Sequence, residues 1–287
     1  MGSGALTISI DLELAWGVGD NVTHNHLRMV ESAERPICEA LIELFDRYQV
    51  RATWAIVAAL LDEKSSNSRP GSRSCWYAPE IIEQLVCAKT AHEIGSHGGR
   101  HIYFDSISTS DAQDDLSFAR DVHRTHALQF DSFVFPRNAV AHLNVLAHAG
   151  LRTFRGPDFG WASAAPNLGQ AAGRVANLVD KLLPIPPRTV KASKHEGLVE
   201  IPGSMLLMGR NGLRRFVLPQ VTRVKLAAGI ERARRTGGVF HLWLHPSNFY
   251  YRREEQLATL AWFLDRAADE ASRGLLDIRT MCSYAIN

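Results

Sequence analysis

Short apolar, β-branched runs alternate with helical patterns along almost the whole chain, and this alternation limits the possible folds more than any other feature. Strands are expected at Ala5 to Asp11 and at 51–57, 93–96, 132–135, 151–154, 197–201, 239–244 and 275–278. Helices with apolar residues three and four positions apart are expected at 32–48, 78–90, 109–127, 142–149, 221–236 and 254–271. Repeated strand–helix units favour a parallel sheet closed into a barrel. The 287 residues fit one such α/β domain, spanning 1–287.

Two segments interrupt the alternation. Residues 156–196 carry one possible helix, Leu168 to Leu183, followed by a proline-rich run at 184–187. We expect this segment to be an elaborated loop over one end of the barrel, where long loops often build substrate sites. The polar residues 63–74 are expected to form a loop or a mobile insertion.

Charge and composition remove several classes of protein. The formal net charge of +2 argues against binding nucleic acid through a basic surface. The apolar stretch at 53–61 is far shorter than the roughly 20 residues of a membrane span. No basic region followed by an apolar core opens the chain, so a cytoplasmic location is expected. The four cysteines lack CxxC spacing and are expected to be reduced thiols (Cys38, Cys75, Cys87 and Cys282).

Two carboxylates lie at the end of the first predicted strand. Side chains two apart on a strand point to the same face, so Asp11 and Glu13 are aimed at one point. A cation or a shared proton would relieve their repulsion there. The alternative is a solvated strand end.

Two imidazoles follow another predicted strand. His97 and His101 lie four residues apart, the spacing that one helical turn brings side by side and that metal sites use. Together with a carboxylate, two neutral imidazoles leave coordination positions open for water, as in a hydrolytic Zn²⁺ site. The pair beside two carboxylates therefore favours a metal site over packed or exposed histidines.

Three further residues are candidates by position. His245 ends an apolar strand, where a histidine is placed to act as an acid or a base. His241, four residues earlier, is expected to be a hydrogen-bonded core histidine. Arg137 follows the strand 132–135 and could hold a carboxylate through two parallel hydrogen bonds, or be an ordinary surface arginine.

Together these motifs resemble the polysaccharide deacetylase family, also called the NodB-homology carbohydrate esterases. The resemblance extends from Ala5 to about Tyr284. It is carried by four segments, Ser9-Ile10-Asp11-Leu12-Glu13, Ser96-His97-Gly98-Gly99-Arg100-His101, Phe135-Pro136-Arg137-Asn138 and Leu242-Trp243-Leu244-His245. By this resemblance the fold would be a distorted (β/α)7 barrel.

Two segments depart from the commonest family pattern. Leu12 stands where that pattern has a metal-binding aspartate, whereas a divergent branch places one residue between the carboxylates, as in Asp11-Leu12-Glu13. Proline and arginine are exchanged at Pro136-Arg137. The resemblance then implies that Asp11 is the base, that Glu13 binds the metal with His97 and His101, and that Arg137 orients Asp11.

The implied reaction is hydrolysis of an N-acetyl or N-formyl group on an amidosugar. Zn²⁺ or another divalent metal would activate a bound water, Asp11 would take its proton, and His245 would protonate the departing amine. Without an export signal, the expected substrate is an intracellular sugar, such as a nucleotide-linked or lipid-linked precursor in polysaccharide or glycoconjugate biosynthesis. The oligomeric state is not predicted.

Other features and functions stay open. Clustered arginines suit a phosphate, although a solvated basic face is the simpler interpretation (Arg210, Arg214 and Arg215). Aromatic residues could stack on a sugar or anchor loops (Trp16, Phe159 and Trp161). The competing functions are hydrolysis of a non-sugar cyclic amide, carbohydrate binding by a catalytically silent protein, and a scaffold subunit of a sugar-modifying complex.

Overall fold

The computed structural model describes residues 4–158 and 183–285, and within them ten strands form one sheet. The strand order is β6-β7-β5-β4-β3-β2-β1-β9-β8, with β10 beside β1, and every pair is parallel except β6 with β7. The bounds are β1 Gly4–Leu12, β2 Thr53–Ile56, β3 Glu93–Ser96, β4 Ser132–Val134, β5 Thr153–Arg155, β6 Ser193–His195, β7 Leu198–Glu200, β8 Met205–Leu206, β9 Val239–Leu244 and β10 Leu276–Ile278.

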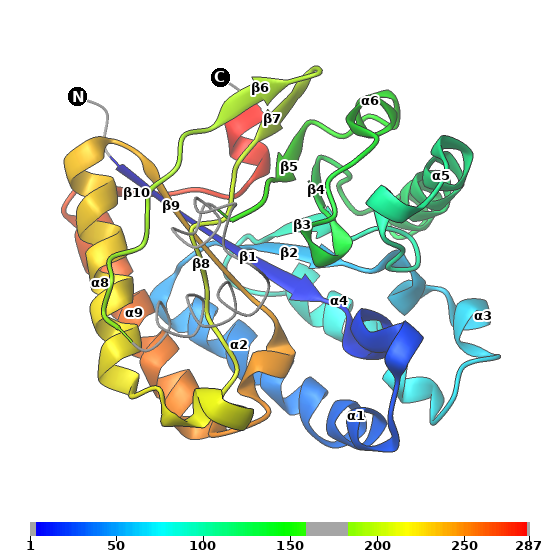
Figure 1. Ribbon diagram of the computed structural model, residues 1–287, viewed down its shortest axis with the longest axis horizontal. Coiled ribbons are helices and arrows are strands. Elements are labelled where there is room, and N and C mark those ends of the chain that lie inside the picture. The colour runs from blue at the N-terminus through cyan, green and yellow to red at the C-terminus, as the bar shows by residue number, and fades with distance from the viewer. Residues whose placement is uncertain (1–3, 159–182, 286–287) are drawn as a thin grey trace, which may run out of the picture.

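Helices cover the outside of this sheet. Figure 1 shows α8 and α9 side by side along one flank and α5 beside α6 at the opposite end. A π-helical turn at Val30–Glu34 joins α1 to α2. The bounds are α1 His24–Met29, α2 Arg35–Tyr48, α3 Glu63–Ser66, α4 Pro79–Val86, α5 Thr109–Thr125, α6 Leu143–His148, α8 Pro219–Thr236 and α9 Arg253–Ser272.

The architecture confirms the predicted α/β fold class, because a mainly parallel sheet with helices on its outside forms a half-barrel (Figure 1). The strands at 93–96 and 239–244 occur as predicted. The segment 63–74 was expected to be a loop, but it contains the short helix α3, which begins where the Asp62 carboxylate accepts a hydrogen bond from the Ser65 backbone N–H. The helix expected at Leu168 to Leu183 lies, apart from its last residue, outside the described residues.

Strand β1 separates two environments. Its apolar residues alternate with polar ones, so Leu6, Ile8, Ile10 and Leu12 pack into the main hydrophobic core beneath the helices. Thr7, Ser9 and Asp11 point to the opposite face, and each finds a polar partner there (Tyr284, His241 and Arg155 respectively). The interior of the half-barrel is therefore polar along β1.

Strand β1 also has three neighbours. Its second half pairs with β2 through Ser9–Leu12, its first three residues pair with β10, and β9 runs along its other edge. The first and last strands of the sheet in chain order are thus adjacent. This arrangement fixes the end of β1 between β2 and β9, and His245 directly follows β9.

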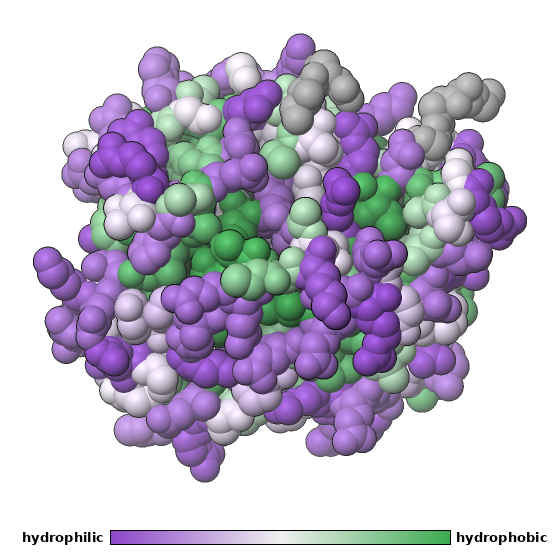
Figure 2. Space-filling view, turned by 180° about the vertical axis from the view of Figure 1, so that it is seen from behind, coloured by the Kyte–Doolittle hydropathy of each residue, from purple (hydrophilic) through white to green (hydrophobic). Residues whose placement is uncertain are grey.

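The surface carries both polar and apolar areas. Within the described residues, no helix combines the length and the hydropathy needed to cross a bilayer. Figure 2 shows hydrophilic side chains over most of one face, surrounding a hydrophobic area near its centre. All four cysteines lie in the described part of the chain and are free thiols, as expected.

Candidate active site

Polar side chains gather where four parallel strands end. Asp11 is the next-to-last residue of β1, and Arg155 is the last residue of β5. His97 directly follows β3, and His245 directly follows β9. Because parallel strands end at the same edge of a sheet, these residues meet around one cavity. The cavity has a volume of about 250 Å³ and is lined by Asp11, Glu13, Gly17, His97, His101, Arg137, Asn138, Arg155, Trp243 and His245.

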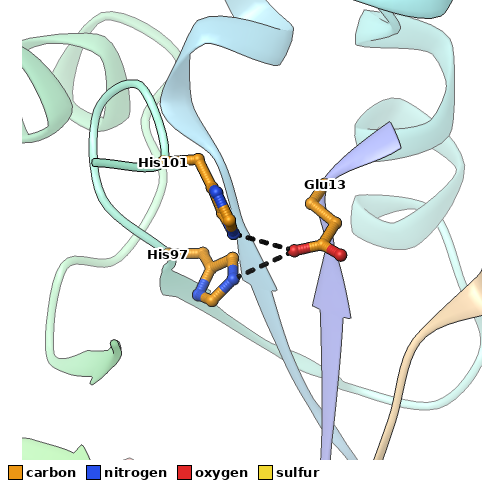
Figure 3. A group of neighbouring side chains, drawn as sticks. All are labelled: Glu13, His97 and His101. Atoms are coloured by element: carbon orange, nitrogen blue, oxygen red, sulfur yellow. Dashed lines mark ion pairs between the residues drawn. The ribbon is translucent and has the colours of Figure 1, made fainter. Parts of the chain in front are cut away.

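Glu13 and two histidines form a compact cluster in this cavity. Their side chains point toward one another from the end of β1 and from the loop after β3 (Figure 3). The Glu13 Oε2 atom lies 3.0 Å from His101 Nε2 and 3.3 Å from His97 Nε2. All three ligand atoms lie within 4.8 Å of one another. The cluster brings together the three residues that the sequence predicts as metal ligands.

A tight loop, not a helix, brings the two histidines together. We expected one helical turn between them, but residues 97–103 form a loop with left-handed backbone at Gly98 (φ 82°) and at His101 (φ 58°). The buried Asp115 carboxylate holds the loop by accepting hydrogen bonds from the backbone N–H groups of Gly99 and Arg100, at 2.6 Å and 3.0 Å. The spacing was therefore informative for a reason other than helix periodicity.

A backbone contact sets the orientation of His97. Its Nδ1 atom lies 2.7 Å from the Val134 carbonyl oxygen, which can only accept, so Nδ1 carries the proton in the neutral ring. The Nε2 lone pair then faces Glu13, as a metal-binding imidazole requires. Burial would lower the pKa of His97, but contact with Glu13 and the nearby Asp11 charge raises it.

The Glu13 carboxylate is also tuned by its neighbours. Burial alone would raise its pKa, yet His245, His101 and His97 lower that pKa well below the ordinary value. Glu13 is therefore an anion, with two imidazole nitrogens at hydrogen-bond distance. A tetrahedral Zn²⁺ with bonds of about 2.1 Å would separate its ligand atoms by about 3.4 Å. The donor set and its spacing fit a divalent cation of this kind.

Asp11 has a different partner. The Arg155 guanidinium donates two parallel hydrogen bonds to it, Nη1 to Oδ1 at 2.6 Å and Nη2 to Oδ2 at 2.7 Å. Both side chains are at most 2% exposed. Burial would raise the pKa of Asp11, but the Arg155 charge, supported by His245 and His97, holds that pKa below its ordinary value. Asp11 is thus an oriented carboxylate that can accept a proton.

A second layer of contacts holds Arg155 in place. Its Nη1 donates to the Ser9 hydroxyl at 3.0 Å, its Nη2 donates to the Asn138 side-chain oxygen at 3.2 Å, and its guanidinium stacks on Trp243 at 4.4 Å. His241 Nδ1 faces two backbone carbonyls, so its Nε2 accepts from the Ser9 hydroxyl at 2.9 Å. Burial lowers the pKa of His241 to about 3. The prediction of a hydrogen-bonded core histidine is confirmed.

His245 lies between the two carboxylates. Its Nε2 atom is 3.5 Å from Asp11 Oδ2 and 3.6 Å from Glu13 Oε1. Its backbone N–H donates to the Asn248 side chain at 2.8 Å, and its imidazole is about one-fifth exposed. The ring is therefore accessible from the cavity, as a proton donor to a leaving group must be.

Arg137 does not make the contact expected of it. Its guanidinium lies 4.3 Å over the Tyr103 ring at the cavity wall, whereas Arg155 binds Asp11. The turn at 136–138 explains the difference, because Arg137 and Asn138 both have left-handed backbone and the second of them faces Arg155. Sequence reasoning missed Arg155, although a basic residue followed by glycine at a strand end was an available signal.

Two features that the sequence left open, the arginine cluster and Trp16, include residues with a structural role. Arg210 is buried and donates to Gln256, to Thr222 and to the Val217 carbonyl, so it is not part of a solvated basic face. Arg214 is half-buried and Arg215 is exposed. Trp16 is 3% exposed and packs edge-on against Trp76, which makes it a core anchor. Phe159 and Trp161 lie outside the described residues.

Comparison with known proteins supports the predicted family. Residues 27–153 match the family model described as polysaccharide deacetylase, a range that includes His97 and His101. The resemblance to this family is thereby confirmed, over a range that does not include Asp11, Glu13 or His245. No curated protein is similar enough in sequence to count as a relative.

Several solved structures share the fold. A Mycobacterium smegmatis protein described as a polysaccharide deacetylase is 14% identical, with a TM-score of 0.69, covering 100% of this chain and 90% of its own. A Pseudomonas aeruginosa protein described as a probable polysaccharide deacetylase is 15% identical, with a TM-score of 0.65, covering 98% and 89%. The PuuE allantoinase is 13% identical, with a TM-score of 0.66, covering 98% and 89%. At these identities the likeness concerns the fold alone.

Proposed function

Taking the match to the polysaccharide deacetylases as a premise, we propose that this chain is a metal-dependent hydrolase that removes an N-acetyl or N-formyl group from an amidosugar. One observation carries the proposal: three metal-ligating atoms lie within 4.8 Å of one another beside a carboxylate held by a buried arginine. A hydrolytic site of this kind needs a place for a cation and a separate base. The cavity offers both.

Glu13, His97 and His101 would hold the cation, and imidazole with carboxylate suits Zn²⁺ best. A bound divalent cation lowers the pKa of a coordinated water toward about 7 and polarises a carbonyl oxygen. The His97 contact with the Val134 carbonyl keeps that ring in the orientation and tautomer that such binding requires. The identity of the cation stays a proposal.

The remaining residues handle protons. Asp11 accepts a proton from the attacking water, and its ion pair with Arg155 keeps the carboxylate deprotonated and fixed in direction. His245, on the same cavity, donates a proton to the amine nitrogen as the carbon–nitrogen bond breaks. Arg155 is a positioning residue here and replaces Arg137 in that role.

The chain is also proposed to be one domain over residues 1–287, because its first and last strands share a sheet. An elaborated loop at 156–196 is part of this proposal, although residues 159–182 lie outside the described range. A nucleotide-linked or lipid-linked amidosugar and a cytoplasmic location stay predictions from the sequence.

The test combines metal content with amine release. We expect the wild type to bind about one equivalent of metal, and Glu13→Ala and His97→Ala to lose both the metal and turnover. His148→Ala and Glu39→Ala are matched controls, because both residues are exposed and lie outside the cavity. Full activity in both Glu13→Ala and His97→Ala would contradict the metal assignment.

The choice of substrates separates the competing functions. Amine release from N-acetyl and N-formyl sugars supports the proposal, whereas release from cyclic amides alone supports a cyclic amide hydrolase. Sugar binding without metal or turnover would instead support a silent carbohydrate-binding protein.

A further inference from the structure

Arg137 is a charged side chain inside the reaction cavity that the proposed chemistry does not use. It is exposed, it lines the cavity, and its guanidinium stacks 4.3 Å above the Tyr103 ring. Within residues 4–158 and 183–285 it forms no ion pair with a carboxylate. Stacking on an aromatic face limits the rotamers of an arginine while leaving its N–H groups free to donate.

The backbone under Arg137 holds this arrangement at a cost. Arg137 and Asn138 both have φ of 54°, a left-handed backbone that is strained for an arginine and less so for an asparagine. The two side chains go to different places. Asn138 accepts a hydrogen bond from Arg155 at 3.2 Å, while Arg137 reaches the exposed side of the same cavity. The strained turn therefore supplies one residue to the Asp11 pair and one to the opening.

The acidic groups of the cavity do not neutralise Arg137. Asp11 is occupied by Arg155 through both carboxylate oxygens, and Glu13 faces imidazoles. The Arg137 guanidinium, exposed at the cavity and without a carboxylate among the lining residues to pair with, is therefore available to an anion that enters the cavity. Guanidinium donors match phosphate and carboxylate oxygens in pairs.

We propose that Arg137 binds an anionic group, a phosphate or a carboxylate, carried by the amidosugar substrate. The inference rests on the proposed function and narrows its substrate class to amidosugars with an acidic group near the amide. Arg137 is then a specificity-determining residue, and Tyr103 is the surface that presents it.

Substrate preference tests this directly. The metal-loaded wild type is assayed with N-acetylglucosamine, its 1-phosphate, its 6-phosphate and N-acetylmuramic acid. We expect kcat/KM to be at least tenfold higher for one of the anionic sugars, and the phosphate and carboxylate arms identify which acid is recognised. Equal kcat/KM for the neutral and all anionic sugars would overturn the inference while leaving deacetylation intact.

Variants of Arg137 test whether this side chain causes the preference for anionic sugars. Arg137→Gln is expected to lower the anionic-to-neutral ratio of kcat/KM at least tenfold, mainly through KM, and Arg137→Lys is expected to restore part of it. Arg223→Gln is the matched control, because Arg223 also stacks on an aromatic ring, Trp262, but does not line the cavity. A ratio that Arg137→Gln leaves unchanged would contradict the assignment.

A binding measurement separates this inference from the proposed function. Inorganic phosphate is titrated into the metal-loaded wild type, Arg137→Gln and Arg223→Gln by calorimetry, with no need for turnover. We expect the Kd for phosphate to rise at least fivefold in Arg137→Gln alone. Equal phosphate affinity in all three proteins would overturn the inference even where amine release depends on Glu13 and His97.

Discussion

The two carboxylates of the cavity lie two residues apart in the chain, yet their surroundings differ in kind. Asp11 is inside β1, 2% exposed, and bound through both oxygens to Arg155. Glu13 lies just beyond the strand, 14% exposed, and its neighbours are imidazole nitrogens. Arg155 already balances the negative charge of Asp11. The Glu13 carboxylate instead faces the Nε2 atoms of His97 and His101, a set of atoms suited to a cation. One strand end thus supplies an oriented carboxylate, the proposed base, and a member of the proposed metal-binding cluster.

The two sides are also built from different parts of the fold. Arg155, Ser9 and His241 all sit on strands, where hydrogen-bonded register fixes their positions. His97 and His101 follow a strand and depend on a loop with left-handed residues and on Asp115. Strand pairing therefore fixes Asp11 and its partners, and a tight loop fixes the two histidines that face Glu13.

The largest expected effect comes from separating the two carboxylates by mutation. Asp11→Asn keeps the shape but removes the base, so we expect kcat to fall by about 10³-fold, within the usual range for general base catalysis. Metal content should stay near the wild-type value, in contrast to Glu13→Ala. Amine release and metal analysis on the same samples measure both. Equal metal loss in Asp11→Asn and Glu13→Ala would show that the two carboxylates do not have separate roles.

Replacing Arg155 should affect Asp11 and leave the cluster of Glu13 and the two histidines intact. Arg155→Gln leaves a buried carboxylate unpaired, which costs about 3–5 kcal/mol in the free energy of unfolding. Asp11 has a lowered pKa in the folded protein, so its ion pair stabilises the wild type above pH 4 and is lost as the pH falls. The acidic limb of kcat/KM should move up by about 1–3 pH units in the variant.

Urea unfolding and pH–rate profiles measure the two effects. Arg152→Gln is the control, because Arg152 pairs with Asp131 at the surface and should contribute less than about 0.5 kcal/mol. An unshifted acidic limb in Arg155→Gln would show that Arg155 does not set the protonation of the base.

Another buried carboxyl sharpens the contrast. Glu34 is as buried as Asp11, but it accepts a hydrogen bond from the Tyr250 hydroxyl. Burial raises the pKa of Glu34 to about 7. The folded protein then binds a proton more tightly than the unfolded chain, so stability falls as the pH rises from about 4.5 to 7. Glu34→Gln should be more stable than the wild type at pH 8 by up to about 3 kcal/mol.

Urea unfolding at pH 5 and pH 8 checks this prediction. Glu39→Gln, on the exposed face of the following helix α2, provides the matched control and should show no pH-dependent gain. The same difference between Glu34→Gln and the wild type at both pH values would rule out titration of Glu34 as the cause.

The smallest effect is expected for Ser9, which contacts Arg155 and His241 rather than Asp11. Ser9→Ala removes one hydrogen bond to the Arg155 guanidinium and one to His241, so we expect a loss of about 1–3 kcal/mol in stability. Turnover should fall less than tenfold, because both hydrogen bonds from Arg155 to Asp11 remain. A loss of kcat as large as that of Asp11→Asn would place Ser9 in the chemistry.

Much of the fold followed from local pattern. The strand at 239–244 was predicted at its observed bounds because its apolar run lies between Gly237-Gly238 and Pro246, and the strand at 93–96 also has its predicted bounds, shortly before Gly98-Gly99. The predicted site residues also came to one edge, since each followed a predicted strand. What the pattern could not supply was the pairing between distant residues.

Arg155 illustrates that limit. It lies 144 residues from Asp11 in the chain, and only the packing of β5 across the half-barrel brings the two together. Arg137 illustrates another, because two consecutive left-handed residues turned it away from Asp11. Asparagine adopts left-handed backbone readily, but nothing in Pro136-Arg137-Asn138 predicts it at the arginine. The loop that joins His97 to His101 was not predicted either, because a spacing of four residues is typical of one helical turn.

The adjacency of β1 and β10 has a consequence for synthesis. Gly4–Leu6 cannot complete its backbone hydrogen bonds until Leu276–Ile278 has left the ribosome, and β9 along the other edge arrives only slightly earlier. Nascent chains must therefore keep an apolar first strand unpaired on one or both edges through most of translation, a state that invites aggregation or chaperone binding. Asp11, the proposed base, is carried on that strand and reaches its final surroundings only late in assembly.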